Sequence, residues 1–203
     1  MDAFEKIYNK FYIPIYEIHQ KLKECKTKFP AEKLRLQKIK DLSEILGNFT
    51  IIDELDIDII KPLNDGHFPF RKKQISNKEF FKCIHITYLA PYLLFARFAY
   101  DLAGNLKISK EQVFNASYKI PIPLKLPKKK TYTWYIQHSH PLTLCKKNGQ
   151  VVSHINIYEK DRECMALENG EIESRFVEAT IMKTINIHTA FQKYMTQQIS
   201  DYL

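Results

Sequence analysis

Glycine is scarce in this sequence, which holds five glycines and nine prolines in 203 residues. No GxGxxG or GxxxxGK[ST] pattern occurs, so the glycine-rich turns that hold nucleotide phosphates in common folds are missing. The sequence therefore excludes the usual dinucleotide-binding and P-loop classes.

Closely spaced cysteines and long apolar runs are also missing. The four cysteines lie far apart, at Cys25, Cys83, Cys145 and Cys164. This spacing is typical of reduced thiols, not of a disulfide framework or a zinc motif. The most apolar segment, 88–99, is too short to span a bilayer, and the N-terminus carries charges where a signal peptide needs an apolar core. We therefore expect a cytoplasmic protein that does not enter a membrane.

Positive charge is in excess but not concentrated. The formal net charge is +8, and the basic runs are short, at 71–73, 128–130 and 146–147. Aromatic residues do not interleave with these runs as a stacking platform for bases would require. We interpret the runs as solvated loop charge. A basic adaptor that binds nucleic acid stays an alternative, and it requires the runs to gather on one surface.

Apolar residues at steps of three and four predict helices over 2–24, 30–46, 77–102 and 174–200. Asp2 and Asn77 are the expected N-caps of the first and third helices, and Gly47 is the expected stop of the second. Pro14 and Pro91 are expected to kink or split the helices that contain them.

Alternating side chains predict strands over 113–122, 131–144 and 150–158. Helices are thus followed by three consecutive antiparallel strands and then by another helix. This order predicts an α+β fold, in which an antiparallel sheet is covered by helices on one face.

The last two strands contain the clearest local signal in the chain. Asn148–Gly149 indicates a type I′ hairpin turn, and this turn pairs Leu144 with Ser153. One face of the hairpin is then apolar and holds Trp134, Ile136, His138, His140, Leu142, Leu144, Ile155 and Ile157. The other face holds Thr133, Tyr135, Gln137, Ser139, Thr143, His154 and Asn156. We expect the apolar face to be the inner one.

The histidines of this hairpin do not predict a metal centre. His138 and His140 share a face, His154 lies on the other, and no carboxylate lies within the two predicted strands to complete a zinc site. We therefore expect no metal and no enzyme. A small hydrolase that depends on a metal or on histidines stays an alternative, and it needs carboxylates converging on the same face.

Several residues between 78 and 160 carry a family resemblance. They are Phe81, Ile84 and His85 in "FFKCIH" before a helix, and Trp134, Pro141 and Gly149 in the strands that follow. With these residues, the region resembles the C-terminal half of a PAS domain. More narrowly, it resembles the PAS-like sensor region of bacterial LuxR-type helix-turn-helix transcriptional regulators.

This resemblance implies a sensory module that binds a small ligand or a partner and relays a conformational change. The implied pocket is lined by Phe114, Tyr118, Trp134, His138, His140 and Ile155. The cofactor is unknown, since the sequence assigns neither haem nor flavin. No helix-turn-helix follows before Leu203, so DNA contact is expected through an output domain that is not present in this chain.

The resemblance also suggests three parts of the chain. These are an N-terminal helical segment (1–47), a PAS-like domain (48–165) and a C-terminal helical extension (166–203). The first and last parts carry apolar stripes that the sheet alone does not cover. We therefore expect a homodimer, with a compact monomer as the alternative.

Overall fold

The structure is a computed structural model, and it describes residues 1–161 apart from 23–25, 28–31, 65–67, 106–109 and 116. The helices are α1 (Ala3–Ile7), η1 (Tyr8–Tyr12), α2 (Ile13–Gln20), α3 (Glu32–Leu46), α4 (Asn77–Phe81), α5 (Ile86–Asn105) and α6 (Lys110–Asn115). The strands are β1 (Lys26–Thr27), β2 (Phe49–Glu54), β3 (Ile59–Pro62), β4 (Tyr118–Leu124), β5 (Thr133–Cys145) and β6 (Val151–Lys160). The helix expected over 174–200 and the extension 166–203 lie outside the described residues.

All the strands form one antiparallel sheet. β2 and β3 form a hairpin at one edge, β4, β5 and β6 form a meander, and β6 lies beside β2. The short β1 pairs with the end of β5. The predicted α+β class, an antiparallel sheet covered by helices, is confirmed.

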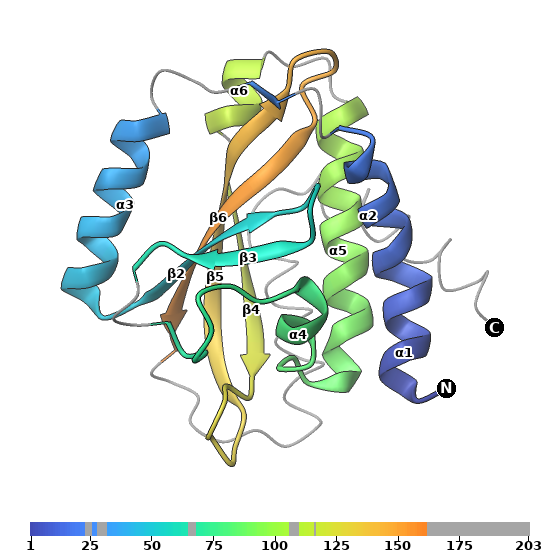
Figure 1. Ribbon diagram of the computed structural model, residues 1–203, viewed down its shortest axis with the longest axis vertical. Helices are drawn as coiled ribbons and strands as arrows, with labels where there is room; N and C mark the ends of the chain where they lie inside the picture. Colours follow the sequence, from blue (N-terminus) through green and yellow to red (C-terminus); the bar gives the residue numbers. More distant parts are fainter. Residues whose placement is uncertain (23–25, 28–31, 65–67, 106–109, 116, 162–203) are drawn as a thin grey trace, which may run out of the picture.

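Helices lie on both sides of the sheet. Figure 1 shows α1, α2 and α5 side by side on one side and α3 on the other. The main core lies between the sheet and the first group, and it contains Tyr8 and Tyr12 from η1, Leu89 and Leu93 from α5, and Ile51 from β2. No helix in the described part of the chain is long and apolar enough to cross a membrane.

The N-terminal helix is continuous but not uniform. Asp2 caps it as predicted, because its Oδ1 accepts a hydrogen bond from the backbone N–H of Glu5 at 2.8 Å. The turn η1 is a π-helix, and Pro14 stands in the first turn of α2 directly after it. The apolar stripe of this helix is buried within the chain at Tyr8, Phe11, Tyr12 and Ile15. Apart from Ile18, which is 38% exposed, this stripe is therefore mostly covered within the chain. The second stripe on which the homodimer prediction was based, in 174–200, lies outside the described residues.

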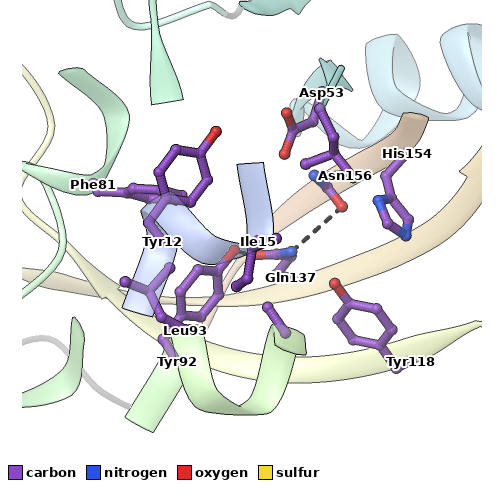
Figure 2. A pocket seen from close by; sticks show the side chains of 12 residues that line it. Tyr12, Ile15, Asp53, Phe81, Tyr92, Leu93, Tyr118, Gln137, His154 and Asn156 are labelled. Carbon is purple, nitrogen blue, oxygen red and sulfur yellow. Dashed lines mark hydrogen bonds between the residues drawn. The ribbon is translucent and has the colours of Figure 1, made fainter. Parts of the chain in front are cut away.

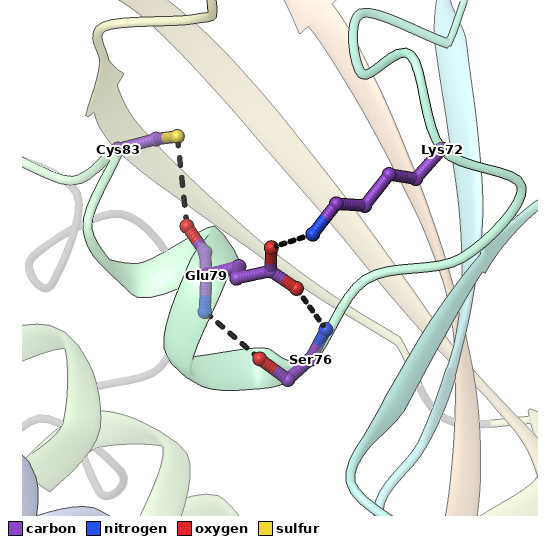
Figure 3. Close-up of polar contacts among 4 residues, drawn as sticks. All are labelled: Lys72, Ser76, Glu79 and Cys83. Carbon is purple, nitrogen blue, oxygen red and sulfur yellow. Dashed lines mark hydrogen bonds and ion pairs between the residues drawn. The ribbon is translucent and has the colours of Figure 1, made fainter.

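The helix predicted over 77–102 is two helices. The chain leaves the helical path between α4 and α5, where the backbone N–H of His85 donates to Pro123 O of β4. Pro91 lies inside α5 and does not divide it. The prediction of Asn77 as N-cap was wrong by one residue. Ser76 caps α4 in a capping box with Glu79, which also pairs with Lys72 (Figure 3).

The strand predicted over 113–122 was wrong at its start. Residues 113–115 belong to α6, and the strand begins at Tyr118. Phe114 therefore lies on a helix, where it packs with Val113, Leu144 and Val151. Alternation over so short a stretch did not distinguish the last turn of a helix from a strand.

The hairpin turn also differs from the prediction. A type I′ turn needs positive φ at both central residues, but here Gly149 adopts it (φ 73°) and Asn148 does not. The loop is longer, and Cys145 donates to Gln150 O at 2.8 Å. Leu144 consequently pairs with Val151 instead of Ser153, and irregularities on either side of Thr143 shift the register further along the strand.

The second predicted helix, α3, exposes several apolar side chains. Gly47 ends it with φ 68°, as predicted. The exposed residues are Leu34 (59%), Leu42 (55%), Ile45 (79%) and Leu46 (64%). Most of the large apolar side chains that are exposed on the described helical residues thus lie on α3.

Candidate functional site

A small polar cavity interrupts the core between the sheet and the helices α2 and α5. Its lining residues are Tyr12, Ile15, Asp53, Leu55, Phe81, Tyr92, Leu93, Ala96, Tyr118, Gln137, His154 and Asn156. Figure 2 shows Tyr12 and Phe81 on one side, Tyr118 and His154 on the other, and Gln137 between them. The cavity has a volume of about 20 Å³, which is room for one or two water molecules.

Buried amides form the floor of this cavity on β5 and β6. The hydroxyl of Tyr92 donates to Gln137 Oε1 at 3.1 Å, and Gln137 Nε2 donates to Asn156 Oδ1 at 3.3 Å. Ser139 Oγ donates to the same Asn156 oxygen at 2.6 Å. Since buried polar groups are costly without partners, this network fixes the orientation of both amides.

The opposite wall is attached to the sheet through carboxylates. Tyr12 donates its hydroxyl to Asp58 Oδ1 at 2.7 Å, and Asn77 Nδ2 donates to Asp53 Oδ1 at 3.1 Å. These two bonds tie the N-terminal helix and α4 to β2 and to the turn that follows it. The wall is thus built from segments that are distant in sequence.

Burial controls the protonation of the titratable groups around the cavity. Burial raises the pKa of Asp53 to about 7. The hydrogen bond from Asn77 lowers this pKa, whereas the nearby carboxylates of Asp58 and Glu54 raise it further. Burial lowers the pKa of His154 to about 3, with a further contribution from His19 and His140. At neutral pH, His154 is uncharged and Asp53 is divided between its two forms.

The phenols of the cavity are neutral under the same conditions. Burial raises the pKa of Tyr118 to about 12. It also raises the pKa of Tyr12 and Tyr92 far above the ordinary value. The hydroxyls can therefore donate hydrogen bonds to a ligand, but they do not supply charge.

Of the residues proposed from the sequence as a pocket, Tyr118 lines the cavity. Trp134 is fully buried and packs edge-on against Tyr88, with 5.6 Å between ring centroids. Phe114 lies on α6, where the Arg35 guanidinium carbon is 3.9 Å from its ring centroid. The structure does not bring these three residues together.

His138, His140 and Ile155 lie on the other side of the sheet. His140 pairs with Ile155 across the strands, and Ile155 stands between His154 and Asn156, which both line the cavity. Because side chains alternate, Ile155 and the residues level with it point away from the cavity. The prediction that the apolar face of the hairpin is the inner one was wrong here. Gln137, Ser139 and Asn156, on the other face, lie toward α2 and α5.

This exchange of faces has a physical reason. Alternation fixes which side chains share a face, but it does not fix which face is buried. A fully hydrogen-bonded internal network has the same sequence pattern as a solvated face. Gln137, His154 and Asn156 were missed for this reason. Tyr12 and Asp53 were missed because they lie on η1 and β2, which only the fold brings beside the hairpin. One available signal was Asp53, a carboxylate that directly follows Ile51 and Ile52 in β2.

The alternative of a histidine-dependent hydrolase meets one favourable contact. His138 Nε2 lies 3.1 Å from Glu159 Oε2, because β6 extends further than predicted and brings a carboxylate beside the histidine. Within the described residues, no group of three or more His, Cys, Asp or Glu side chains is placed to hold a metal ion. Ser139 bonds to Asn156 on the opposite face and is not available to His138 as a nucleophile.

The alternative of a nucleic-acid adaptor needs its basic runs to be close together. The runs 128–130 and 146–147 flank opposite ends of β5, which has 13 residues. At about 3.3 Å per residue, such a strand separates its ends by roughly 40 Å. These two runs do not form one patch.

Comparisons with known proteins add little to this description. No family model and no curated protein matches the sequence. Among solved structures, the chain is similar to one described as a sensory box histidine kinase/response regulator from Burkholderia thailandensis E264. The TM-score is 0.44 and the sequence identity 9%, over 62% of this chain and 86% of that one. A similarity this weak supports no statement about ligand, activity or partner.

Proposed function

We propose that this chain is a PAS-like sensory module that binds a small molecule in the cavity between its sheet and helices. The observation that carries the proposal is the composition of the cavity wall. Polar side chains with fixed orientation lie inside an apolar core, and they meet residues of the N-terminal helix, α4 and α5. A site of this kind joins a recognition surface to helices that can move.

The small volume of the cavity sets the mechanism. Pockets for metabolite-sized ligands occupy about 300–1,000 Å³, whereas this cavity has about 20 Å³. A ligand larger than a few atoms must displace part of the wall. We expect Tyr12 and Ile15 to move. Both belong to the N-terminal helix, and the hydrogen bond from Tyr12 to Asp58 attaches this helix to the turn after β2.

Ligand binding would then select between two positions of the N-terminal helix. A ligand that binds the open position more tightly shifts the population toward it, and the helix passes this change to an output. By the resemblance to LuxR-type regulators, we propose transcriptional regulation as the output. DNA contact would come from a separate output domain, and a homodimer would couple two modules.

Native mass spectrometry of the purified protein tests the proposal. We expect a population heavier than 24.1 kDa, carrying a small molecule that denaturation releases. Ala96→Leu, which fills the cavity, should lose this adduct. Thr87→Leu, on an exposed position of the same helix, should keep it. Absence of any adduct, together with no thermal shift across a metabolite library, would contradict the proposal.

The same ligand should also change the emission of Trp134, the one tryptophan in the chain. Trp134 packs against Tyr88 at the start of α5, so a movement of that helix alters its surroundings. A ligand that binds without changing the emission or the exchange of amides in residues 3–20 would leave the relay unsupported.

A further inference from the structure

Asp53 is the one acidic residue in the wall of the cavity, and no described cation contacts it. Its Oδ1 accepts from the Asn77 amide, and no Lys or Arg is among the lining residues. Other carboxylates in the described structure have cationic partners, such as Glu54 with Lys61 at 2.8 Å and Glu5 with Lys78 at 3.0 Å. Asp53 is only partly exposed to solvent, and a carboxylate with reduced hydration and no nearby cation is costly.

Aromatic rings surround the same space. Tyr12 and Phe81 meet edge to face with 4.9 Å between their centroids, and Phe81 and Tyr92 lie 6.2 Å apart. Tyr118 closes the far side beside His154 (Figure 2). The faces of such rings attract organic cations. The amide oxygen of Gln137 accepts one hydrogen bond from Tyr92 and can accept a second from an N–H group.

We propose that the ligand of this cavity is a small organic cation, a protonated amine, with Asp53 as its counter-ion and the tyrosine and phenylalanine rings around it. The proposal rests on the sensory function proposed above and names the ligand class of that site. An anion would meet the Asp53 carboxylate with no compensating charge in the lining. A neutral ligand would leave the ionised carboxylate without a cationic partner.

The size of the cavity selects the probe. Ammonium and methylammonium are close to the size of one or two water molecules, so they fit with little movement of Tyr12. We would measure the melting temperature and Trp134 emission against methylammonium chloride, with sodium chloride at equal ionic strength as the reference. Methanol and sodium acetate serve as the neutral and anionic probes. We expect a saturable response to methylammonium that is at least tenfold stronger than the response to either of these.

Two matched variants separate the counter-ion from general charge. Asp53→Asn keeps the acceptor for Asn77 but removes the charge, and it should weaken the methylammonium response at least tenfold. Asp41→Asn removes a carboxylate on the exposed surface of α3 that does not line the cavity. Because Asn also accepts the hydrogen bond from Gln37, this variant should keep the fold and the response.

The response should also depend on pH. The groups facing Asp53 are Asn77 on α4, Glu54 and Asp58 on β2 and its turn, Tyr12 on η1, Tyr92 on α5, Tyr118 on β4 and His154 on β6. His154 and the three phenols keep one protonation state between pH 6 and 8. Asp53 has a pKa of about 7, so methylammonium binding should weaken about tenfold from pH 8 to pH 6.

The outcomes distinguish this inference from the function on which it rests. Equal responses to methanol and methylammonium, or an Asp53→Asn variant that responds like the parent, would overturn the cationic ligand. A copurified neutral molecule that Ala96→Leu excludes would also overturn it, while supporting the sensory function. If methylammonium binds but neither Trp134 emission nor residues 3–20 respond, the ligand class stands and the relay fails.

Discussion

At the scale of single residues, Trp134 shows how a large side chain secures one end of the sheet. It is fully buried, it stacks edge-on against Tyr88, and its backbone oxygen accepts a hydrogen bond from Asp161. Tyr88 in turn donates its hydroxyl to Pro121 O on the neighbouring strand. The ring thus joins α5, β4 and β5.

We expect Trp134→Ala to lower the free energy of unfolding by about 3–5 kcal/mol, the range for removing a large buried aromatic side chain. Urea unfolding followed by circular dichroism measures it. Trp134→Phe, which keeps a ring, should lose clearly less. A Trp134→Ala variant that unfolds at the parent's urea concentration would show that this packing is wrong.

His154 should make the protein sensitive to acid. Its pKa is about 3 in the folded protein and 6.5 in the unfolded chain, so the unfolded state takes up the proton first as pH falls. Stability is therefore lost below pH 6.5, by up to about 3 kcal/mol at pH 4. Asp53, whose pKa is raised, has the opposite slope between about pH 4 and 7.

The variant His154→Gln isolates this contribution. Its stability relative to the parent should improve between pH 7 and pH 4.5 in urea titrations. His138→Gln is the control, because His138 is less buried and its contact with Glu159 opposes the lowering of its pKa. An equal change with pH in both variants would contradict a special role for His154.

At the scale of elements, local sequence signals predicted the ends of helices well, but they did not predict which face of the strands is buried in the core. Asp2 and Gly47 act as predicted, because a cap or a left-handed stop depends on neighbours in sequence. To predict the start of α4 correctly, Glu79 has to be recognised as the capping-box partner of Ser76, which identifies Ser76 and not Asn77 as the N-cap. The Asn77 side chain instead donates to Asp53.

We expect Ser76→Ala to cost about 1 kcal/mol, because it removes the hydrogen bond to the backbone N–H of Glu79. Thermal unfolding at fixed pH measures this loss. Ser76→Thr keeps a hydroxyl and should lose only a fraction of it. If Ala and Thr are equally stable at this position, the cap contributes nothing.

At the scale of the whole molecule, the N-terminal helix is part of the same core as the sheet. Tyr8, Phe11 and Tyr12 pack in one cluster with residues of α5, β2 and β6. Periodicity predicted this helix and its stripe, but it could not say what the stripe packs against. The partner of an amphipathic face depends on contacts between distant segments, and one sequence does not contain them.

Deleting residues 1–20 should therefore abolish cooperative unfolding, because it removes four buried core side chains and opens the cavity. Calorimetry or circular dichroism melting tests this. The control is Leu42→Ala on the exposed face of α3, which should change stability by less than about 0.5 kcal/mol. A truncated chain that melts as sharply as the parent would separate the helix from the core.

The homodimer stays a prediction, now without the N-terminal stripe as its surface. Light scattering across a dilution series measures it. A constant mass of 24.1 kDa at every concentration would contradict it. A dimer that Ile45→Glu on α3 dissociates would instead assign the contact to the exposed leucine and isoleucine face of that helix.

The π-helical turn at Tyr8–Tyr12 has a consequence for how relatives of this chain should be aligned. Such a turn contains one residue more than the α-helix around it, as a single-residue insertion produces. Each residue rotates an α-helix by about 100°, so losing Asn9 would turn Phe4 and Ile7 away from the core that they contact. In a relative that lacks one residue here, the apolar residues that correspond to 3–7 should therefore be shifted by one position in the sequence. An alignment that puts the gap elsewhere would compare residues from different faces of the helix.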